Sequence, residues 1–345
     1  MHIPEWLPYR DDFFSSYCSL VENEYGRGCY QSSKHYFHWL YSANEYSRGF
    51  DDCLIGVVDG VEVVGCIHKM RLPWLIRGEL SYVPTLHNLI IKPKYRTGAG
   101  FWLLKKALYG EDHGVVPGVR QPFSEVFRQM KCQPVPSKWF QLPLRYVRGG
   151  IALGLHKLTY GAFTQRRYFE NRDATISGCR LTTSPSTDDL ERVAATLNAS
   201  SGRDHVMWDS RLVRWRFFDE SGPRHAFIEM SDDPAAHAVV SLGPRSGLIV
   251  ARIILISDAW ITHGESGLRR ICDLLGHTPA HAVLAMTVLE DFATLLTAGQ
   301  FTRYKIHPDT YLFHKDRQFL QESILGSEVT DIGFESLICS NVNRE

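Results

Sequence analysis

The stretch "LHNLIIKPKYRTGAGFWLL", residues 86–104, places a histidine and an asparagine just ahead of a glycine-rich turn. The apolar run around His87 predicts a strand, and the residues after Gly100 predict an apolar helix. Such a turn can simply redirect the chain. It can also bind phosphates, because a helix N-terminus leaves backbone N–H groups without partners and glycines allow close approach. A histidine titrates near neutral pH, so His87 is a candidate for proton transfer.

The elements around this stretch occur twice along the chain. The first half predicts, in order, helices 9–25 and 34–46, a hairpin 53–70 turning at Asp59-Gly60, a strand 81–93, a helix 99–109, a strand 114–119, a helix 121–132 and a closing strand 137–147. The second half predicts a helix 210–220, a hairpin 225–243, a strand 247–258, a helix 265–275, a strand 280–288, a helix 289–301 and closing strands 303–316. Trp39 and Trp215 hold corresponding places, each with an aromatic residue two positions on, Tyr41 and Phe217. The shared order indicates an internal duplication.

Length and composition limit the classes of protein that fit. A chain of 345 residues suits two domains, which we predict at 1–172 and 173–345, with the boundary in the polar stretch 165–182. Lysine plus arginine equals aspartate plus glutamate, 38 each, so no net charge favours nucleic acid or an anionic membrane. No apolar run has the length of a membrane span and the start lacks a signal-peptide pattern, which predicts a cytoplasmic protein. The eight cysteines are scattered and the histidines are dispersed, so we expect free thiols and no metal.

The segment "NLIIKPKYRTGAGFWLL" resembles the signature of the GNAT (GCN5-related) N-acetyltransferases, a strand and proline followed by Arg/Gln-x-x-Gly-x-Gly/Ala at the start of a helix. Leu89 and Ile91 match the strand, and Pro93 matches the proline. The loop is about one residue shorter than the family pattern. The resemblance implies an α/β (α+β) fold with two GNAT-like domains in tandem, each a mixed, mostly antiparallel sheet flanked by helices.

In that family the donor is a coenzyme A thioester. The resemblance implies that the strand Leu89, Ile90 and Ile91 holds the pantetheine arm and that the loop holds the pyrophosphate. The loop residues are Arg96, Thr97, Gly98, Ala99, Gly100 and Phe101. Glycines and the helix dipole favour an anion there on physical grounds as well.

Only the first half carries this loop, since the second has "AWITHGESG" at the corresponding place. This arrangement is similar to bilobal GNAT enzymes that acylate amino sugars on nucleotide carriers. The resemblance implies acetyl-CoA or 3-hydroxybutyryl-CoA as donor, an amino-deoxysugar for lipopolysaccharide or a surface glycan as acceptor, and a monomer or homodimer. The alternatives are another small amine or a peptide as acceptor, a tandem GNAT that uses aminoacyl-tRNA, and a CoA-binding protein without activity. Zero net charge and the presence of the loop argue against the tRNA alternative.

The resemblance also implies roles at the reaction centre. A backbone N–H near Leu89 to Ile91 polarises the thioester carbonyl. His87 stands where the family often has its base, and Asn88 orients substrate if a bulge turns it to the same face. A histidine that only packs, and an amine that attacks without a base, are the competing interpretations. The helix that usually supplies a tyrosine acid has Phe127 instead.

In the second half, the stretch "HVMWDSRLVRWRFF" supplies an aromatic ring and guanidinium groups for a nucleotide diphosphate. We expect Trp208, Arg211 and Arg214 to bind the acceptor. The competing interpretation is an amphipathic helix with its apolar residues in the core and its arginines in solvent.

Overall fold

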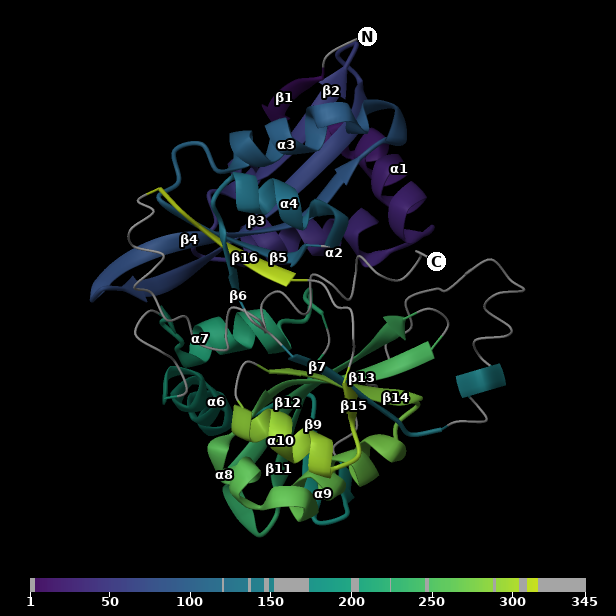
Figure 1. Ribbon diagram of the computed structural model, residues 1–345, viewed down its shortest axis with the longest axis vertical. Helices are drawn as coiled ribbons and strands as arrows, with labels where there is room; N and C mark the ends of the chain where they lie inside the picture. The colour runs from purple at the N-terminus through teal and green to yellow at the C-terminus, as the bar shows by residue number, and fades with distance from the viewer. Residues whose placement is uncertain are drawn as a thin grey trace.

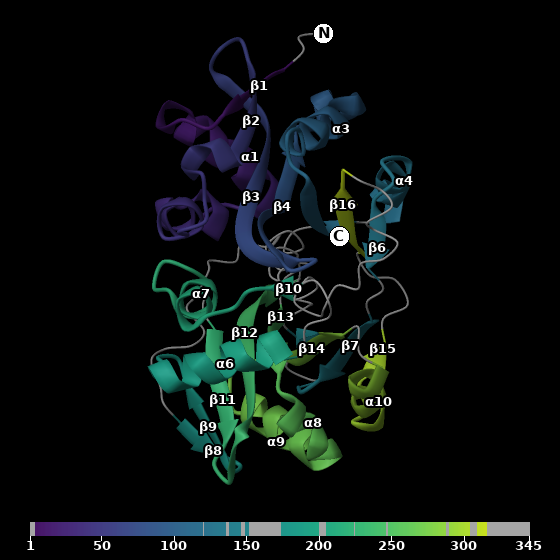
Figure 2. The same ribbon diagram turned by 90° about the vertical axis from the view of Figure 1, so that its left-hand side faces the viewer.

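The computed structural model describes residues 4–119, 121–135, 138–145, 149–151, 174–199, 205–223, 225–245, 248–287, 290–303 and 309–315. Two mixed sheets, each flanked by helices, lie one above the other along the long axis (Figures 1 and 2). The pairs β4–β5 and β13–β14 are parallel and the other strand pairs are antiparallel. The predicted fold class is therefore confirmed.

The strands of the first sheet are, in spatial order, β1 (Glu5–Pro8), β2 (Cys53–Val58), β3 (Glu62–Ile76), β4 (Glu79–Ile91), β5 (His113–Val119), β16 (Asp309–His314) and β6 (Gln133–Val135), with β10 (His205–Val206) paired to β3. Those of the second sheet are β15 (Thr302–Arg303), β7 (Lys138–Pro143), β14 (Ala282–Thr287), β13 (Leu248–Ile256), β12 (Asp233–Arg245), β11 (His225–Met230), β9 (Cys179–Thr182) and β8 (Ala174–Ile176). The α-helices are α1 (Phe14–Tyr25), α2 (Lys34–Phe37), α3 (Arg96–Ala107), α4 (Gln121–Gln129), α6 (Thr187–Ala199), α7 (Ser210–Val213), α8 (Asp258–Thr262), α9 (Gly264–Gly276) and α10 (Glu290–Ala298).

The elements predicted in both halves form, with differences at some ends. The β2–β3 turn has positive φ at both Asp59 (53°) and Gly60 (73°), as the predicted two-residue hairpin turn requires. The predicted helices 34–46 and 210–220 are shorter. Each is one turn of α-helix, α2 or α7, that continues as a π-helix, His38–Ser42 or Arg214–Phe218. The strands β1, β6, β8, β9 and β10 and the helices α6 and α8 were not predicted.

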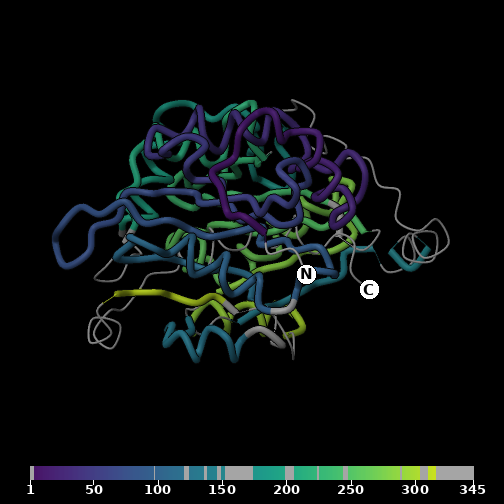
Figure 3. The backbone as a smooth tube through the Cα atoms, turned by 90° about the horizontal axis from the view of Figure 1, so that it is seen from above, coloured from purple at the N-terminus to yellow at the C-terminus, as the bar shows by residue number. Residues whose placement is uncertain are grey.

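The two halves exchange their closing strands. β16 lies between β5 and β6 in the first sheet, and β7 lies between β14 and β15 in the second. In Figures 1 and 3 the yellow β16 accordingly runs among the blue elements of the first half. The strands β7 and β16, which lie within the predicted closing strands 137–147 and 303–316, thus each pair with the sheet of the other half. The sequence pattern does not show this, because an apolar strand does not encode which sheet edge it pairs with. The predicted boundary between 172 and 173 lies outside the described residues.

Three apolar cores hold these layers together. One lies between β2–β5 of the first sheet and helices α3 and α4, and another lies under α8, α9 and α10 of the second. The third is shared, since it joins α1, α2, α6 and α7 to residues of both sheets. Figure 2 shows α1 on one side of the first sheet and α3 and α4 on the other. The shared core makes the two halves one packed body.

At the centre of the shared core, Trp39 and Trp215 contact each other across the two halves. Their rings stack with centroids 5.4 Å apart at 17°. Trp39 Nε1 donates to the carbonyl of Trp215 at 3.0 Å, and Trp215 Nε1 donates to the carbonyl of Trp39 at 2.8 Å. Each tryptophan is in a π-helix that follows a capped turn, where Ser33 or Asp209 accepts from the backbone N–H three residues on. The contact is reciprocal, as at a two-fold interface, and supports the predicted duplication.

None of the described helices has both the length and the apolar composition needed to cross a membrane. The seven cysteines in the described ranges are free thiols, as predicted, and Cys339 lies outside those ranges.

We predict that Trp39→Phe destabilises the protein more than Trp74→Phe. Both tryptophans are buried, but Trp74 Nε1 has no hydrogen-bond partner among the described residues, so its replacement removes ring volume alone. Trp39→Phe also removes a donor from a buried carbonyl, which costs about 1–3 kcal/mol more. Urea unfolding of both variants measures the difference. Equal free energies of unfolding would contradict a stabilising role for the reciprocal hydrogen bonds.

Candidate functional site

The strand β4 carries a bulge at Asn88. His87 lies opposite His68 of β3 and Ile90 lies opposite Cys66, so two residues of β4 face the single Ile67. Asn88 has a φ of 52°, in the left-handed region that asparagine tolerates better than most residues. The bulge turns Asn88 to the face that His87 already occupies, as the hypothesis for its role required. Leu89, the next residue, is 42% exposed.

The parallel strands β4 and β5 separate next to this bulge. Their pairing consists of Thr85 opposite Val115, and both strands lie within the continuously described range 4–119. In the second half, the corresponding strands β13 and β14 stay paired from Val250 to Ile253. The β4 backbone after Thr85 is therefore available to hydrogen-bond an extended ligand, whereas β13 is occupied by its neighbour as far as Ile253.

The glycine turn lies at the end of β4, where α3 begins. Arg96 Nε donates to the carbonyl of Ile91 at 3.0 Å and so fixes the turn to the strand. Gly98 has a φ of 78°, and an added Cβ there would meet no atom within 4 Å. No side chain caps α3 and no acidic residue stands in its first turn, in contrast to Glu265 in the first turn of α9. The start of α3 thus has the open backbone and the polarity that an anion needs.

The other residues predicted for the cofactor surround this turn. Ile90 is buried in the shared core and Ile91 in the core beneath α3, while Ala99 packs at the edge of that core. Phe101 is 39% exposed, and the side chain of Thr97 lies outside the described part of the structure.

His87 and Asn88 form a chain of hydrogen bonds with two tyrosines from the neighbouring helices. The Nδ1 of His87 donates to the carbonyl of Thr85 at 3.3 Å, so Nε2 accepts from the Tyr36 hydroxyl at 2.9 Å. Asn88 Nδ2 donates to the same hydroxyl at 2.8 Å, and Tyr25 donates to Asn88 Oδ1 at 3.3 Å. These tyrosines were not predicted as site residues, because aromatic residues of a helix usually belong to a core.

A second histidine lies against the first. The rings of His68 and His87 stack with centroids 5.6 Å apart at 20°. The Tyr17 hydroxyl lies 3.0 Å from His68 Nε2, and the Tyr41 hydroxyl lies 2.5 Å from Nδ1. His68 is fully buried, so these two hydroxyls satisfy both of its ring nitrogens in place of solvent.

Burial keeps both histidines neutral. Desolvation lowers the pKa of His87 to about 4, with a smaller contribution in the same direction from the charge of Arg216. Desolvation also holds the pKa of His68 well below its usual range. The expectation that His87 titrates near neutral pH was therefore wrong. The imidazole is neutral and able to accept a proton across the physiological range, but it is a weak base.

The helix α4 supplies no acid at the predicted place. Phe127 is buried there and stacks on Tyr311 of β16, with ring centroids 5.1 Å apart. Within the described ranges, no three His, Cys, Asp or Glu side chains group together as metal ligands would. The hydroxyl that is hydrogen-bonded to His87 among the described residues is that of Tyr36.

The three residues predicted for the acceptor differ in their surroundings. Trp208 is buried, stacks on Phe217 at 5.8 Å, and has its backbone N–H and carbonyl bonded to Asn198. This placement in the core does not support stacking on a substrate. Arg214 is exposed on the π-helix. Arg211, with its side chain 79% exposed, lines a cavity shared with the first half.

Comparisons with known proteins find the fold but no close relative. No family model matches this sequence, and no curated protein does. The structure is similar to N-myristoyltransferase of Saccharomyces cerevisiae with bound myristoyl-CoA, with a TM-score of 0.62 and 14% identity over 91% of this chain and 79% of that one. It is also similar to GCN5-related N-acetyltransferases from Kribbella flavida (TM-score 0.51, 15% identity, 90% and 72% of the two chains) and Anabaena variabilis (0.52, 10%, 90% and 72%). Likeness at such identities concerns the fold. The chain has a GNAT fold built from two halves, as its loop and its repeated order of elements predicted.

Proposed function

We propose that this protein transfers an acyl group from an acyl-CoA to an amine. The observation that carries the proposal is the coincidence, in the first half, of the β4 bulge, the separation of β4 from β5 and the open turn at Gly98. A strand with free backbone groups suits the amides of a pantetheine arm, and the turn suits a pyrophosphate. In the second half the corresponding strands stay paired up to the residue before the bulge, so one donor site per chain is proposed.

The residues of β4 supply the chemistry in this proposal. The amine nitrogen bonds to the thioester carbon, and a backbone N–H beyond the bulge stabilises the charge on the oxygen. The amine loses a proton to the Tyr36 oxygen while Tyr36 passes its own proton to His87 Nε2. The C–S bond then breaks, and the thiolate takes the proton back along the same path. An alkyl thiol has a pKa near 8.5 and an imidazolium of pKa about 4 is a much stronger acid, so the return is favourable.

For the acceptor we propose an amino-deoxysugar, carried on a nucleotide and destined for a surface glycan or lipopolysaccharide, with acetyl-CoA or 3-hydroxybutyryl-CoA as donor and the cytoplasm as the place of reaction. Two halves with a single donor loop support this assignment, as does an arginine of the second half that reaches the first.

A peptide amine is the second candidate. An assay of free thiol release distinguishes the amino sugar from the peptide as acceptor. The donors are acetyl-, 3-hydroxybutyryl- and myristoyl-CoA, and each is tested with nucleotide-linked amino sugars and with peptides. Release with peptides alone would exclude the sugar.

We predict that Gly98→Asp weakens CoA binding by at least tenfold, because it places a carboxylate against the pyrophosphate. Gly110→Asp is the matched control. Gly110 has a φ of 79° and open surroundings like those of Gly98, but it lies beyond the other end of α3. Both variants carry the same backbone strain, so their melting temperatures should fall equally. Calorimetry gives the dissociation constants, and equal CoA affinities in the two variants would refute the proposed turn.

We predict that Tyr36→Phe and His87→Gln each lower kcat by roughly a hundredfold, and that the double variant is no slower than either one. Groups that relay one proton act as a unit, so their effects are not additive. Because the pKa of His87 is about 4, the acidic limb of the rate profile above pH 5 belongs to the acceptor amine and should remain in His87→Gln. Multiplied effects in the double variant, or loss of that limb, would contradict the relay. Assays below the melting temperature of each variant exclude unfolding as the cause.

A further inference from the structure

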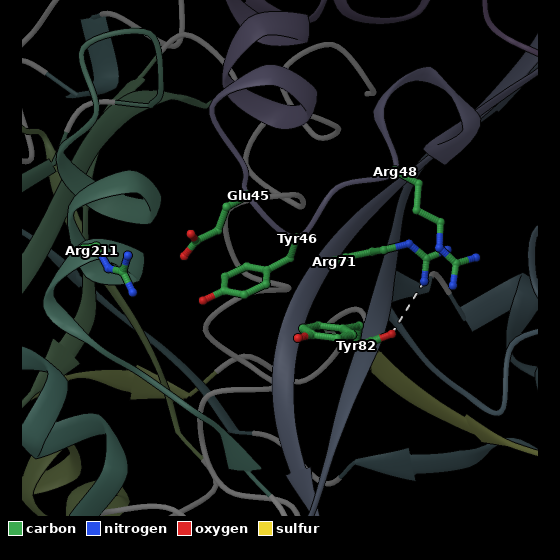
Figure 4. A pocket seen from close by; sticks show the side chains of 6 residues that line it. All are labelled: Glu45, Tyr46, Arg48, Arg71, Tyr82 and Arg211. Atoms are coloured by element: carbon green, nitrogen blue, oxygen red, sulfur yellow. Dashed lines mark hydrogen bonds between the residues drawn. The ribbon is translucent and has the colours of Figure 1, made fainter.

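A cavity of about 480 Å³ lies between the two halves, away from the glycine turn. It opens beside the β3–β4 hairpin, the segment after the first π-helix, and α7 of the second half (Figure 4). The lining residues are Glu45, Tyr46, Arg48, Arg71, Tyr82 and Arg211. Its volume is in the range of small-molecule sites.

One of the three arginines is part of the cavity wall and is already paired. Arg71 is 1% exposed, and its Nε donates to Asp52 Oδ1 at 2.8 Å. Its two other nitrogens donate to both oxygens of Glu111, at 3.0 and 2.5 Å. Lys69 Nζ also donates to Glu111 Oε1 at 3.0 Å, so two buried cations face two carboxylates and make a rigid, nearly neutral wall. Arg71 therefore shapes the cavity and has little charge left for a ligand.

The other two arginines are loosely held and come from opposite halves. Arg48 has its side chain 64% exposed and lies 3.9 Å from Glu111. Arg211 has its side chain 79% exposed and lies 3.6 Å from Asp209. Both distances are beyond those of a strong charge-assisted hydrogen bond. Figure 4 shows the two on opposite sides of the tyrosines, so a ligand there meets guanidinium groups from both halves.

Between the arginines lie two stacked tyrosines. The rings of Tyr46 and Tyr82 have centroids 5.8 Å apart at 27°. Tyr82 is 51% exposed, so one face of the pair is open to stack on a further flat ring. Glu45, the acidic residue of the lining, can accept hydrogen bonds from hydroxyl or imino groups of such a ring.

The cavity lies toward the opposite end of β4 from the glycine turn. Tyr82 is five residues before His87 on that strand, about 17 Å at the usual rise, while the turn follows the other end of the strand. A donor held by the turn and a ligand in the cavity would thus approach His87 from opposite ends of the strand. Tyr82 and His87 are an odd number of residues apart in an unbroken register with β3, so the ligand must also cross from the face of Tyr82 to that of His87. A single sugar phosphate is too short to join the cavity to His87, whereas a diphosphate between two rings has the necessary length.

We propose that this cavity binds the nucleoside diphosphate portion of the acceptor, with its flat ring on Tyr82 and its phosphates between Arg48 and Arg211. That the bound molecule is the acceptor rests on the proposed acyl transfer. Binding of a nucleoside diphosphate in the cavity does not depend on catalysis and can be measured alone. The proposed site includes Arg211, one of the three residues that the sequence analysis predicted for the acceptor. It adds Arg48 and the two tyrosines, which the sequence did not single out.

Calorimetry of the full chain with uridine diphosphate, inorganic pyrophosphate and uridine tests the proposal. We expect uridine diphosphate to bind more tightly than either fragment. Arg48→Ala and Arg211→Ala should each weaken it about tenfold, the effect of losing one charge-assisted pair. Tyr82→Leu should weaken uridine diphosphate and leave pyrophosphate unchanged. Arg214→Ala, on the continuation of the same helix but outside the lining, is the matched control and should bind as the wild type does.

The glycine turn is a second place where a diphosphate could bind, and Gly98→Asp distinguishes the two. This variant should lose CoA and retain uridine diphosphate, whereas Arg48→Ala and Arg211→Ala should do the reverse. Absence of uridine diphosphate binding, or equal affinity in the wild type and both arginine variants, would overturn the cavity assignment and leave the acyl-CoA proposal standing. Binding of uridine diphosphate without binding of CoA would support the cavity and remove the proposed donor.

Discussion

The pairing of Trp39 with Trp215 is the constraint on which the arrangement of the two halves depends. Two indoles that donate to each other's backbone carbonyls fix both the separation and the rotation of the π-helices that carry them. The position of the Trp39 ring also requires a glycine at residue 222, since a Cβ there would lie 2.7 Å from Trp39 Nε1. The strand exchange adds a second link, because each sheet includes a strand from the other half. A cavity whose arginines come from both halves keeps its geometry only if such links hold.

A scaffold with this symmetry can still hold an asymmetric site. Both halves bulge at the equivalent strand, β4 at Asn88 and β13 at Ile254, where Val239 and Val240 pair with Leu255 and Ile253. The halves differ in the residues before the bulge. In the first, β4 pairs with β5 at Thr85, three residues before the bulge, and then leads to an uncapped helix without acidic residues in its first turn. In the second, β13 stays paired with β14 up to Ile253, the residue before the bulge, and leads to α8, which Ser257 caps. The bulge is therefore part of the shared framework, and in the proposed function the earlier separation of the strands adapts one half to a donor.

The sequence allowed prediction wherever the cause is local. The Asp59-Gly60 turn, the order of elements and the correspondence of Trp39 with Trp215 follow from residue types and spacing. The exchange of β7 and β16 could not be predicted, because pairing between distant strands depends on the whole fold. The low pKa of His87 could not be predicted either, since it arises from burial beneath α1 and α2. Trp208 was predicted to bind the acceptor because of its aromatic ring, whereas in the fold that ring packs against Phe217 in the core.

The long hairpin of β3 and β4 links the cavity, the bulge at Asn88 and the glycine turn, the three places that take part in the proposed reaction. Its strands run from the second half, where β10 pairs with Leu75 and Trp74, to the turn that begins α3. One continuous strand thus carries Tyr82 at the cavity, His87 and Asn88 at the bulge, and Ile91 at the turn. Because a paired strand resists stretching and bending, the distances between these three places are fixed by residue count. In the proposed reaction, selectivity for acceptor length would then be a property of the strand itself: an amine would reach Tyr36 and His87 only if the group that anchors it in the cavity lay the right distance away, along the strand and across to the face of His87.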